Sequence, residues 1–197
     1  MKFKKFAIFA DLKLESYHYI KSLKKSVKSK ISGKKLFFNH KPHITIFTFY
    51  SNCKKEQLID IFIKKKPQLN KNSIKIKTIN FFVKDIQTGL DTLHFEIEKS
   101  YLLEYQKSFY SIFKNCISHN LSIFNKNFTH FQTLRENIKL YGFPFYGETW
   151  IPHVTIGSYL MNEHSSIPKN IEIKKNIFLS KFSFHEIDEN HDYKKLK

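Results

Sequence analysis

The chain has few of the residues that build disulfide scaffolds, metal clusters or flexible linkers. Its 197 residues include 2 cysteines, 5 glycines and 5 prolines. Cys53 and Cys116 form neither a Cys-x-x-Cys motif nor a disulfide framework, which favours a reducing compartment such as the cytoplasm. No stretch rich in Gly, Ser or Pro separates two regions, and the length suits one substantial core. We therefore expect one domain over residues 1–197, in the cytoplasm.

The sequence also lacks long apolar runs. No stretch has the length of a membrane span, and the apolar "FAIFA" near the N-terminus is too short for a signal peptide and is followed by Asp11. We expect no membrane partner, and we expect a monomer.

Acidic residues are scarce relative to basic ones. Lys and Arg together number 34 against 17 Asp and Glu, which gives a formal net charge of +17 and indicates a polyanionic partner. A lysine-rich solvated surface, with a composition also biased toward Asn, Ile and Phe, is the alternative explanation. Arg135 is the single arginine, and this argues against base reading in a duplex groove, where arginine is the usual reader. The expected partner is RNA or a small nucleotide, contacted through phosphate.

The residues that are present predict a globular α+β protein. Hydrophobic residues make up 41% of the chain, and apolar periodicity alternates between strand-like and helix-like segments. The expected strands cover 3–12, 43–50, 73–83, 92–98, 153–160 and one or two segments within 171–188. The expected helices cover 14–30, 54–66 and 101–118, with Ser100 as the N-cap of the last. We expect an aromatic loop over 121–150 and solvated, lysine-rich termini. The order of elements suggests a bilobal, duplicated fold in which two antiparallel sheets form a central cleft and the helices pack outside.

One short motif occurs twice. The chain reads "KPHITIF" over 41–47 and "IPHVTIG" over 151–157. Side chains two apart on a strand share a face, so His43, Thr45 and Phe47 should point one way. In the second copy, His153, Thr155, Gly157 and Tyr159 should share a face. If the two strands face each other, a cleft between them holds two imidazoles and two hydroxyls.

This set of side chains suits cleavage of a phosphodiester. One group must take a proton from the attacking oxygen and another must give a proton to the leaving oxygen, and histidine exists in both protonation states near pH 7. Threonine hydroxyls can donate hydrogen bonds to the non-bridging oxygens and stabilise their charge. Either histidine could be the base, and our working assignment is His43 as base and His153 as acid.

The paired motif resembles the 2H phosphoesterase superfamily, which includes 2′-5′ RNA ligase-like proteins and cyclic phosphodiesterases. The resemblance extends over nearly the whole chain and implies a bilobal fold with a metal-independent site. It implies His43 and His153 as the catalytic pair, and Thr45 and Thr155 as phosphate-binding residues. The implied substrates are RNA ends or small nucleotides that carry a 2′,3′-cyclic phosphate or a 2′-5′ linkage.

The second motif departs from many relatives because "HVTIGSYL" carries no following basic residue. We expect Lys41 or Arg135 to balance the phosphate charge instead. Aromatic side chains near the second motif could stack a nucleobase, and we expect Tyr146, Trp150 and Tyr159 to be substrate contacts.

Several other interpretations stay open. The motif histidines could be hydrogen-bonded structural residues, or the chain could be a non-catalytic RNA- or nucleotide-binding module of the same fold. Ligation of 2′-5′ RNA is the reverse reaction at the same site. A zinc site would need a ligand pattern that the ten histidines do not show, so we expect no metal and no cofactor. His94 shares an alternating face with Glu96 and Glu98, which we expect to be solvated. Six further histidines, in loop-like or mixed surroundings, we expect to lie mostly at the surface: His40, His119, His130, His164, His185 and His191.

Overall fold

A computed structural model describes residues 3–31, 33–160, 173–188 and 192–197, to which all structural statements refer. The strands are β1 (Lys4–Leu12), β2 (Lys35–Leu36), β3 (His43–Ser51), β4 (Ser73–Phe82), β5 (Asp91–Ile97), β6 (His153–Tyr159), β7 (Asn176–Ile187) and β8 (Tyr193–Lys195). The helices are α1 (Leu14–Ser29), α2 (Lys55–Lys65), α3 (Ser100–Phe113), α4 (Lys126–His130) and α5 (Gln132–Tyr141). Three single 3₁₀ turns cover Lys114–Cys116, Leu121–Ile123 and Gly147–Thr149.

The strands form one strongly bent antiparallel sheet rather than two separate ones. The strand order is β2-β6-β5-β4-β7-β1-β3, and β8 pairs with β7. A first half contains β3, β1, β7 and β8, and a second half contains β2, β6, β5 and β4. The ladder between Ser73–Lys75 of β4 and Asn176–Phe178 of β7 joins the two halves. The predicted α+β fold class is confirmed. The prediction had two antiparallel sheets, and this short ladder joins them into one.

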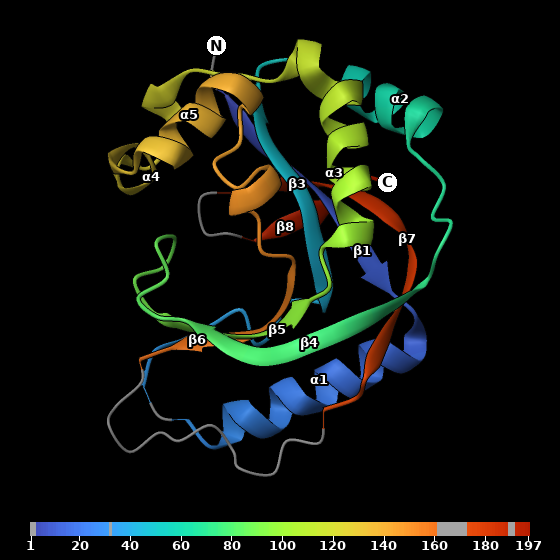
Figure 1. The fold of residues 1–197 in the computed structure, drawn as a ribbon, viewed down its shortest axis with the longest axis vertical. Coiled ribbons are helices and arrows are strands. Elements are labelled where there is room, and N and C mark those ends of the chain that lie inside the picture. The colour runs from blue at the N-terminus through green and yellow to red at the C-terminus, as the bar shows by residue number, and fades with distance from the viewer. Residues whose placement is uncertain (1–2, 32, 161–172, 189–191) are drawn as a thin grey trace.

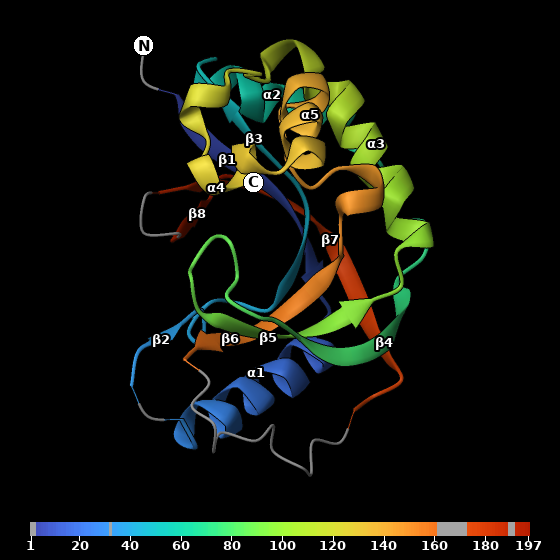
Figure 2. The ribbon, with the colours of Figure 1, turned by 60° about the vertical axis from the view of Figure 1, so that its left-hand side comes forward.

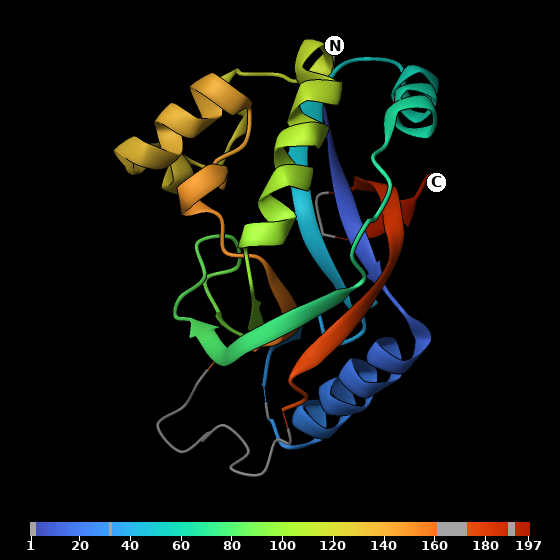
Figure 3. The same ribbon diagram turned by 45° about the vertical axis from the view of Figure 1, so that its right-hand side comes forward.

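The two halves face each other, and the longer helices cover their outer faces (Figures 1 and 2). Helix α1 buries Ile20 and Val27 against the second half, and α3 runs along β3 of the first half (Figure 3). These helices present an apolar stripe at three- and four-residue spacing, which is why the predicted ranges match the observed ones closely. The motif strands β3 and β6 lie near each other across the bend of the sheet.

Residues 121–150 differ from the predicted loop, because they contain α4 and α5. The Asn125 side chain accepts from the amide of Asn127 and begins α4. Gly142, at φ 65°, ends α5, where a left-handed conformation favours glycine. Leu134, Ile138 and Tyr141 recur at four- and three-residue spacing, so α5 is amphipathic, but it is short and largely polar and buries Ile138 alone.

Two further expectations need correction. Ser100 lies inside α3 and gives no side-chain cap. The C-terminal lysine-rich segment was not expected to form a strand, but it forms β8, with the Tyr193 ring 5.1 Å from that of Phe9. Aromatic packing rather than local propensity therefore orders this end of the chain.

Candidate functional site

A cleft of about 730 Å³ lies between the two halves of the sheet. Both motif histidines and both motif threonines line it, although they come from strands about a hundred residues apart in the sequence. Lys41 and Trp150 also line it, as predicted for substrate contacts. The loop between β4 and β5 rises from the second half toward the first (Figure 2) and contributes Asp85 to the wall.

The backbone orients the His43 imidazole. Its Nδ1 donates a hydrogen bond to the carbonyl of Lys41 at 2.7 Å, and its ring stacks on Phe9 at 3.7 Å between centroids. A carbonyl only accepts, so Nδ1 carries the hydrogen and the neutral ring presents the lone pair of Nε2. The Tyr193 hydroxyl donates to the same carbonyl at 3.1 Å, and its ring meets His43 edge-on.

His153 has the same arrangement on the opposite half. Its Nδ1 donates to the carbonyl of Ile151 at 2.8 Å, and the edge of Phe82 lies against it at 4.9 Å between centroids. For both motif histidines, Nε2 has no hydrogen-bond partner within the described ranges. Each ring therefore has one nitrogen held by the backbone and one free for a ligand.

A β-bulge follows each motif threonine. In the pairing of β1 with β3, Phe9 lies opposite Thr45 but Ile8 lies opposite Phe47. In the pairing of β5 with β6, His94 lies opposite Thr155 but Leu93 lies opposite Gly157. Each motif strand thus has one extra residue directly after its threonine, and the bulge reverses which face the following side chains occupy.

These bulges explain two wrong predictions about side-chain direction. Phe47 is fully buried instead of sharing the face of His43 and Thr45. Tyr159 is 2% exposed and does not line the cleft; burial raises its pKa to about 12. Both side chains lie beyond a bulge, which simple alternation does not reveal.

The other predicted contacts that fail lie outside the cleft. The Tyr146 ring stacks on Tyr141 at 3.9 Å between centroids, so the segment buries its own aromatic side chain. Arg135 is exposed on α5 and does not line the cleft. Its helix was not predicted, and this explains why its position was misjudged.

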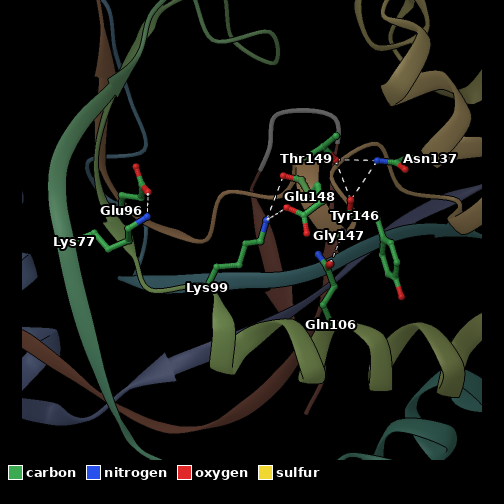
Figure 4. Close-up of polar contacts among 9 residues, drawn as sticks. All are labelled: Lys77, Glu96, Lys99, Gln106, Asn137, Tyr146, Gly147, Glu148 and Thr149. Atoms are coloured by element: carbon green, nitrogen blue, oxygen red, sulfur yellow. Dashed lines mark hydrogen bonds and ion pairs between the residues drawn. The ribbon is translucent and has the colours of Figure 1, made fainter.

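Polar contacts hold the segment that leads into β6 (Figure 4). The Asn137 amide donates to the carbonyl of Tyr146 and to the Thr149 hydroxyl, and the Gln106 side chain accepts from the amide of Gly147. Gln106 also donates to the carbonyl of Ile46 on the first motif strand. Gln106 of α3 therefore links the segment before His153 to the strand that carries His43, and Asn137 of α5 holds the same segment from the other side of its turn.

The electrostatic surroundings of the two motif histidines differ. Burial lowers the pKa of His43 to about 3, and the nearby charges of Lys24, His185 and His40 lower it further, against the hydrogen bond to Lys41. Burial also lowers the pKa of His153, but there the hydrogen bond to Ile151 and the Asp85 carboxylate oppose the shift. The charges near His43 therefore add to the effect of burial on its pKa, whereas the Asp85 carboxylate near His153 opposes that effect.

Two further histidines lie beside the motif histidines, which corrects their assignment to the surface. His94 is fully buried and stacks on Phe82 at 3.9 Å between centroids, and its ring lies 5.2 Å from that of His153. His185 is 4% exposed and lies 4.4 Å from Phe9. The rings of Phe82 and Phe9 lie against these two histidines, so alternation along a strand does not separate a solvated face here. Of the remaining predicted surface histidines, His119 and His130 are exposed, His40 is half-buried, and His164 and His191 lie outside the described residues.

Lys24, Tyr193, Phe9 and Phe82 also belong to the cleft wall but carry no motif signal. Lys24 occupies a core position of α1, and only its apolar neighbours Ile20 and Val27 indicated that this face is buried. Within the described ranges, no group of three His, Cys, Asp or Glu residues is arranged to hold a metal ion. None of the described helices is both long and apolar enough to cross a membrane.

Comparison with solved structures identifies the fold. No protein-family model matches the sequence, and no curated protein matches it. A structure described as a phosphoesterase superposes with a TM-score of 0.59 at 12% identity, covering 100% of this chain and 97% of that one. Escherichia coli LigT superposes with TM-scores of 0.55 in its complex with phosphate and 0.56 in its complex with NADP+, at 10% identity, covering 100% of this chain and 96% of LigT. The chain therefore has the fold of LigT-like phosphoesterases, as the resemblance implied.

Proposed function

We propose that the protein is a phosphodiesterase of the 2H type, with His43 and His153 as its acid-base pair. The observation that carries the proposal is that both imidazoles line one cleft, each with Nδ1 bound to a backbone carbonyl and Nε2 free. General acid-base catalysis needs two such groups on either side of one reacting phosphorus. The LigT-like fold supports this interpretation.

The unequal electrostatics favour His43 as the base. Burial and the positive charges around His43 keep its Nε2 unprotonated in the resting site, so its lone pair is the acceptor for the proton of the attacking water as the water oxygen bonds to phosphorus. His153, next to the Asp85 carboxylate, gains a proton more readily when a phosphate anion is bound. Its Nε2–H then gives that proton to the ribose oxygen as the phosphorus–oxygen bond breaks. A cyclic phosphate becomes a phosphomonoester, and solvent restores both rings.

Thr45 and Thr155 would bind the non-bridging oxygens. Both side chains line the cleft on the same strand faces as the histidines, before the bulges. Their hydroxyls can donate to oxygens whose charge grows during the reaction. All four residues together supply the proton transfers and the charge stabilisation, so we propose that no metal ion is required.

The cleft supports a nucleotide substrate. Its volume of about 730 Å³ is in the range of small-molecule sites, and its wall includes Phe82, Phe145 and Trp150. LigT, which shares the fold, has been crystallised with phosphate and with NADP+, both of which carry phosphate. We propose RNA ends or small nucleotides with a 2′,3′-cyclic phosphate or a 2′-5′ linkage as substrates.

The test is hydrolysis of 2′,3′-cyclic mononucleotides and 2′-5′ oligoadenylate, read by mass spectrometry. We expect His43→Ala and His153→Ala each to lower kcat/KM by roughly 10²–10⁴ while the protein stays folded. His130→Ala, at an exposed position outside the cleft, is the matched control and should retain wild-type turnover. Activity should also survive EDTA.

Other outcomes would identify a different function. Full turnover in a folded His153→Ala protein would contradict the proposal, and loss of activity with EDTA would indicate a metal-dependent reaction. Salt-sensitive RNA binding that is indifferent to both histidines, without hydrolysis, would indicate a binding module. Joining of RNA ends in the same assay would indicate the reverse reaction.

A further inference from the structure

Lys24 is a lysine at a core position of an amphipathic helix. It lies between Ile20 and Val27 on the buried stripe of α1 and is 3% exposed, whereas its neighbours Lys21 and Lys25 are exposed. Lysine is almost never this deeply buried without a partner, because an ammonium group loses its hydration. The position therefore calls for a functional explanation.

The Lys24 ammonium is directed to the second motif strand. Its Nζ donates to the carbonyl of Thr155 at 3.1 Å, and the residue lines the cleft together with His43 and His153. Within the described ranges, no carboxylate lies within ion-pair distance of Nζ. An ammonium has three donors, so among the described residues the single carbonyl leaves two donors and the positive charge without a protein partner.

The charge of this group acts inside the cleft. Burial lowers the pKa of Lys24 to about 8, so the side chain is mainly protonated at pH 7. Its charge contributes to the lowered pKa of His43. Three other lysines line the cleft. Lys41 and Lys84 are exposed, and an exposed cation attracts an anion more weakly because water screens it. Lys5 is half-buried but lies opposite Tyr50, at the other end of β3 from His43.

We propose that Lys24 is the phosphate-binding cation of the cleft, donating from Nζ to a non-bridging oxygen while the Thr155 carbonyl holds it. The inference rests on the proposed function and extends it. Strand β6 carries no lysine or arginine, so this charge reaches the second motif from helix α1 instead of from the strand itself.

The test combines binding of inorganic phosphate with turnover at pH 7. Lys24→Met keeps the length of the side chain and removes the charge, and Lys24→Gln is a second variant that keeps a donor. Lys25→Met is the matched control, because it removes the same charge from an exposed position on the same helix. Phosphate affinity is measured by isothermal titration calorimetry, kcat/KM with the cyclic mononucleotides, and folding by thermal melting.

We expect both Lys24 variants to bind phosphate about tenfold or more weakly than wild type and Lys25→Met, with a parallel loss of kcat/KM. Their melting temperature should be unchanged or higher, since a buried charge has been removed. Wild-type phosphate affinity in both Lys24 variants, or a wild-type protein that does not bind phosphate, would overturn the proposal. Turnover that depends on the histidines but not on Lys24 would refute this inference alone. Lys24-dependent phosphate binding without hydrolysis of any substrate would refute the proposed function alone.

Discussion

At the scale of single residues, the site uses backbone carbonyls to select one tautomer of each histidine. His43 donates to the carbonyl two residues before it, and so does His153, so both rings present Nε2 to the cleft. Tyr193 adds a second hydrogen bond to the carbonyl that holds His43, although it comes from the other end of the chain. Proline precedes both histidines, but the sequence does not indicate the role of the carbonyl before it.

His94 and His185 are two separate buried histidines, and both are neutral. Nδ1 of His94 donates to the carbonyl of Thr92, and Nε2 of His185 donates to the hydroxyl of Ser183, which donates in turn to Asp11. The second nitrogen of each ring is buried, with no hydrogen-bond partner within the described ranges. Burial, as the largest cause, lowers the pKa of both rings to about 4. Neither ring can accept a second proton without placing a charge in the interior.

This arrangement predicts an acid-labile fold. The folded-state pKa values lie below the unfolded value of about 6.5, so the unfolded chain binds more protons at low pH. The stability that the folded state gains from keeping these two rings neutral is therefore complete above about pH 6.5 and is lost as the pH falls toward 4. We expect each ring to contribute about 3 kcal/mol to this loss. Denaturant unfolding of wild type at intervals from pH 7 to pH 4 measures the slope of the unfolding free energy against pH and so tests this prediction.

The slope should be attributable to individual residues. The His94→Phe variant has no titratable group at this position, so its unfolding free energy should depend less on pH than that of wild type, whatever its absolute stability. His130→Phe, at an exposed position, is the matched control and should retain the wild-type slope. Equal slopes in wild type and His94→Phe would show that this buried ring does not contribute.

At the scale of elements, the paired bulges decide which side chains reach the cleft. Alternation along β3 and β6 correctly placed His43, Thr45, His153 and Thr155 on one face. In both strands, alternation predicts the wrong face for the side chains that follow the residue after the motif threonine. The reason is that a bulge depends on the partner strand and has no local sequence signal. Tyr159 was therefore predicted in the cleft but packs in the core.

Gly157, directly after the second bulge, provides a test at this scale. Its missing side chain makes room for the Phe38 ring, which a Cβ at position 157 would overlap. We expect Gly157→Ala to destabilise the protein by about 1–3 kcal/mol, because neither β6 nor the buried Phe38 can move freely. Denaturant unfolding measures the loss.

A double mutant separates this clash from other causes. Phe38→Leu reduces the ring that occupies the space above Gly157. The Gly157→Ala and Phe38→Leu double mutant should therefore lose less stability than the sum of the single mutants. Strict additivity would show that the two residues do not compete for the same space.

At the scale of the whole molecule, the duplicated motif and the order of elements were enough to predict the fold class. They also predicted that His43 and His153 would line one cleft, because each strand carried the same polar pair above an aliphatic face. The contributions of Lys24, His185 and Tyr193 could not be predicted in this way. Each comes from an element whose position depends on how the sheet bends, and the three lie far apart in the sequence.

The central claim is that the Nε2 atoms of His43 and His153 bind one anion between them. The most direct measurement is ¹⁵N NMR of histidine-labelled protein during titration with inorganic phosphate, with His43→Gln and His153→Gln variants to assign the signals. We predict that the Nε2 resonance of His153 shifts toward the imidazolium position, that the Nε2 resonance of His43 shifts as it accepts a hydrogen bond from the anion, and that both saturate with one shared dissociation constant. A shift at only one ring, or two different dissociation constants, would contradict the account.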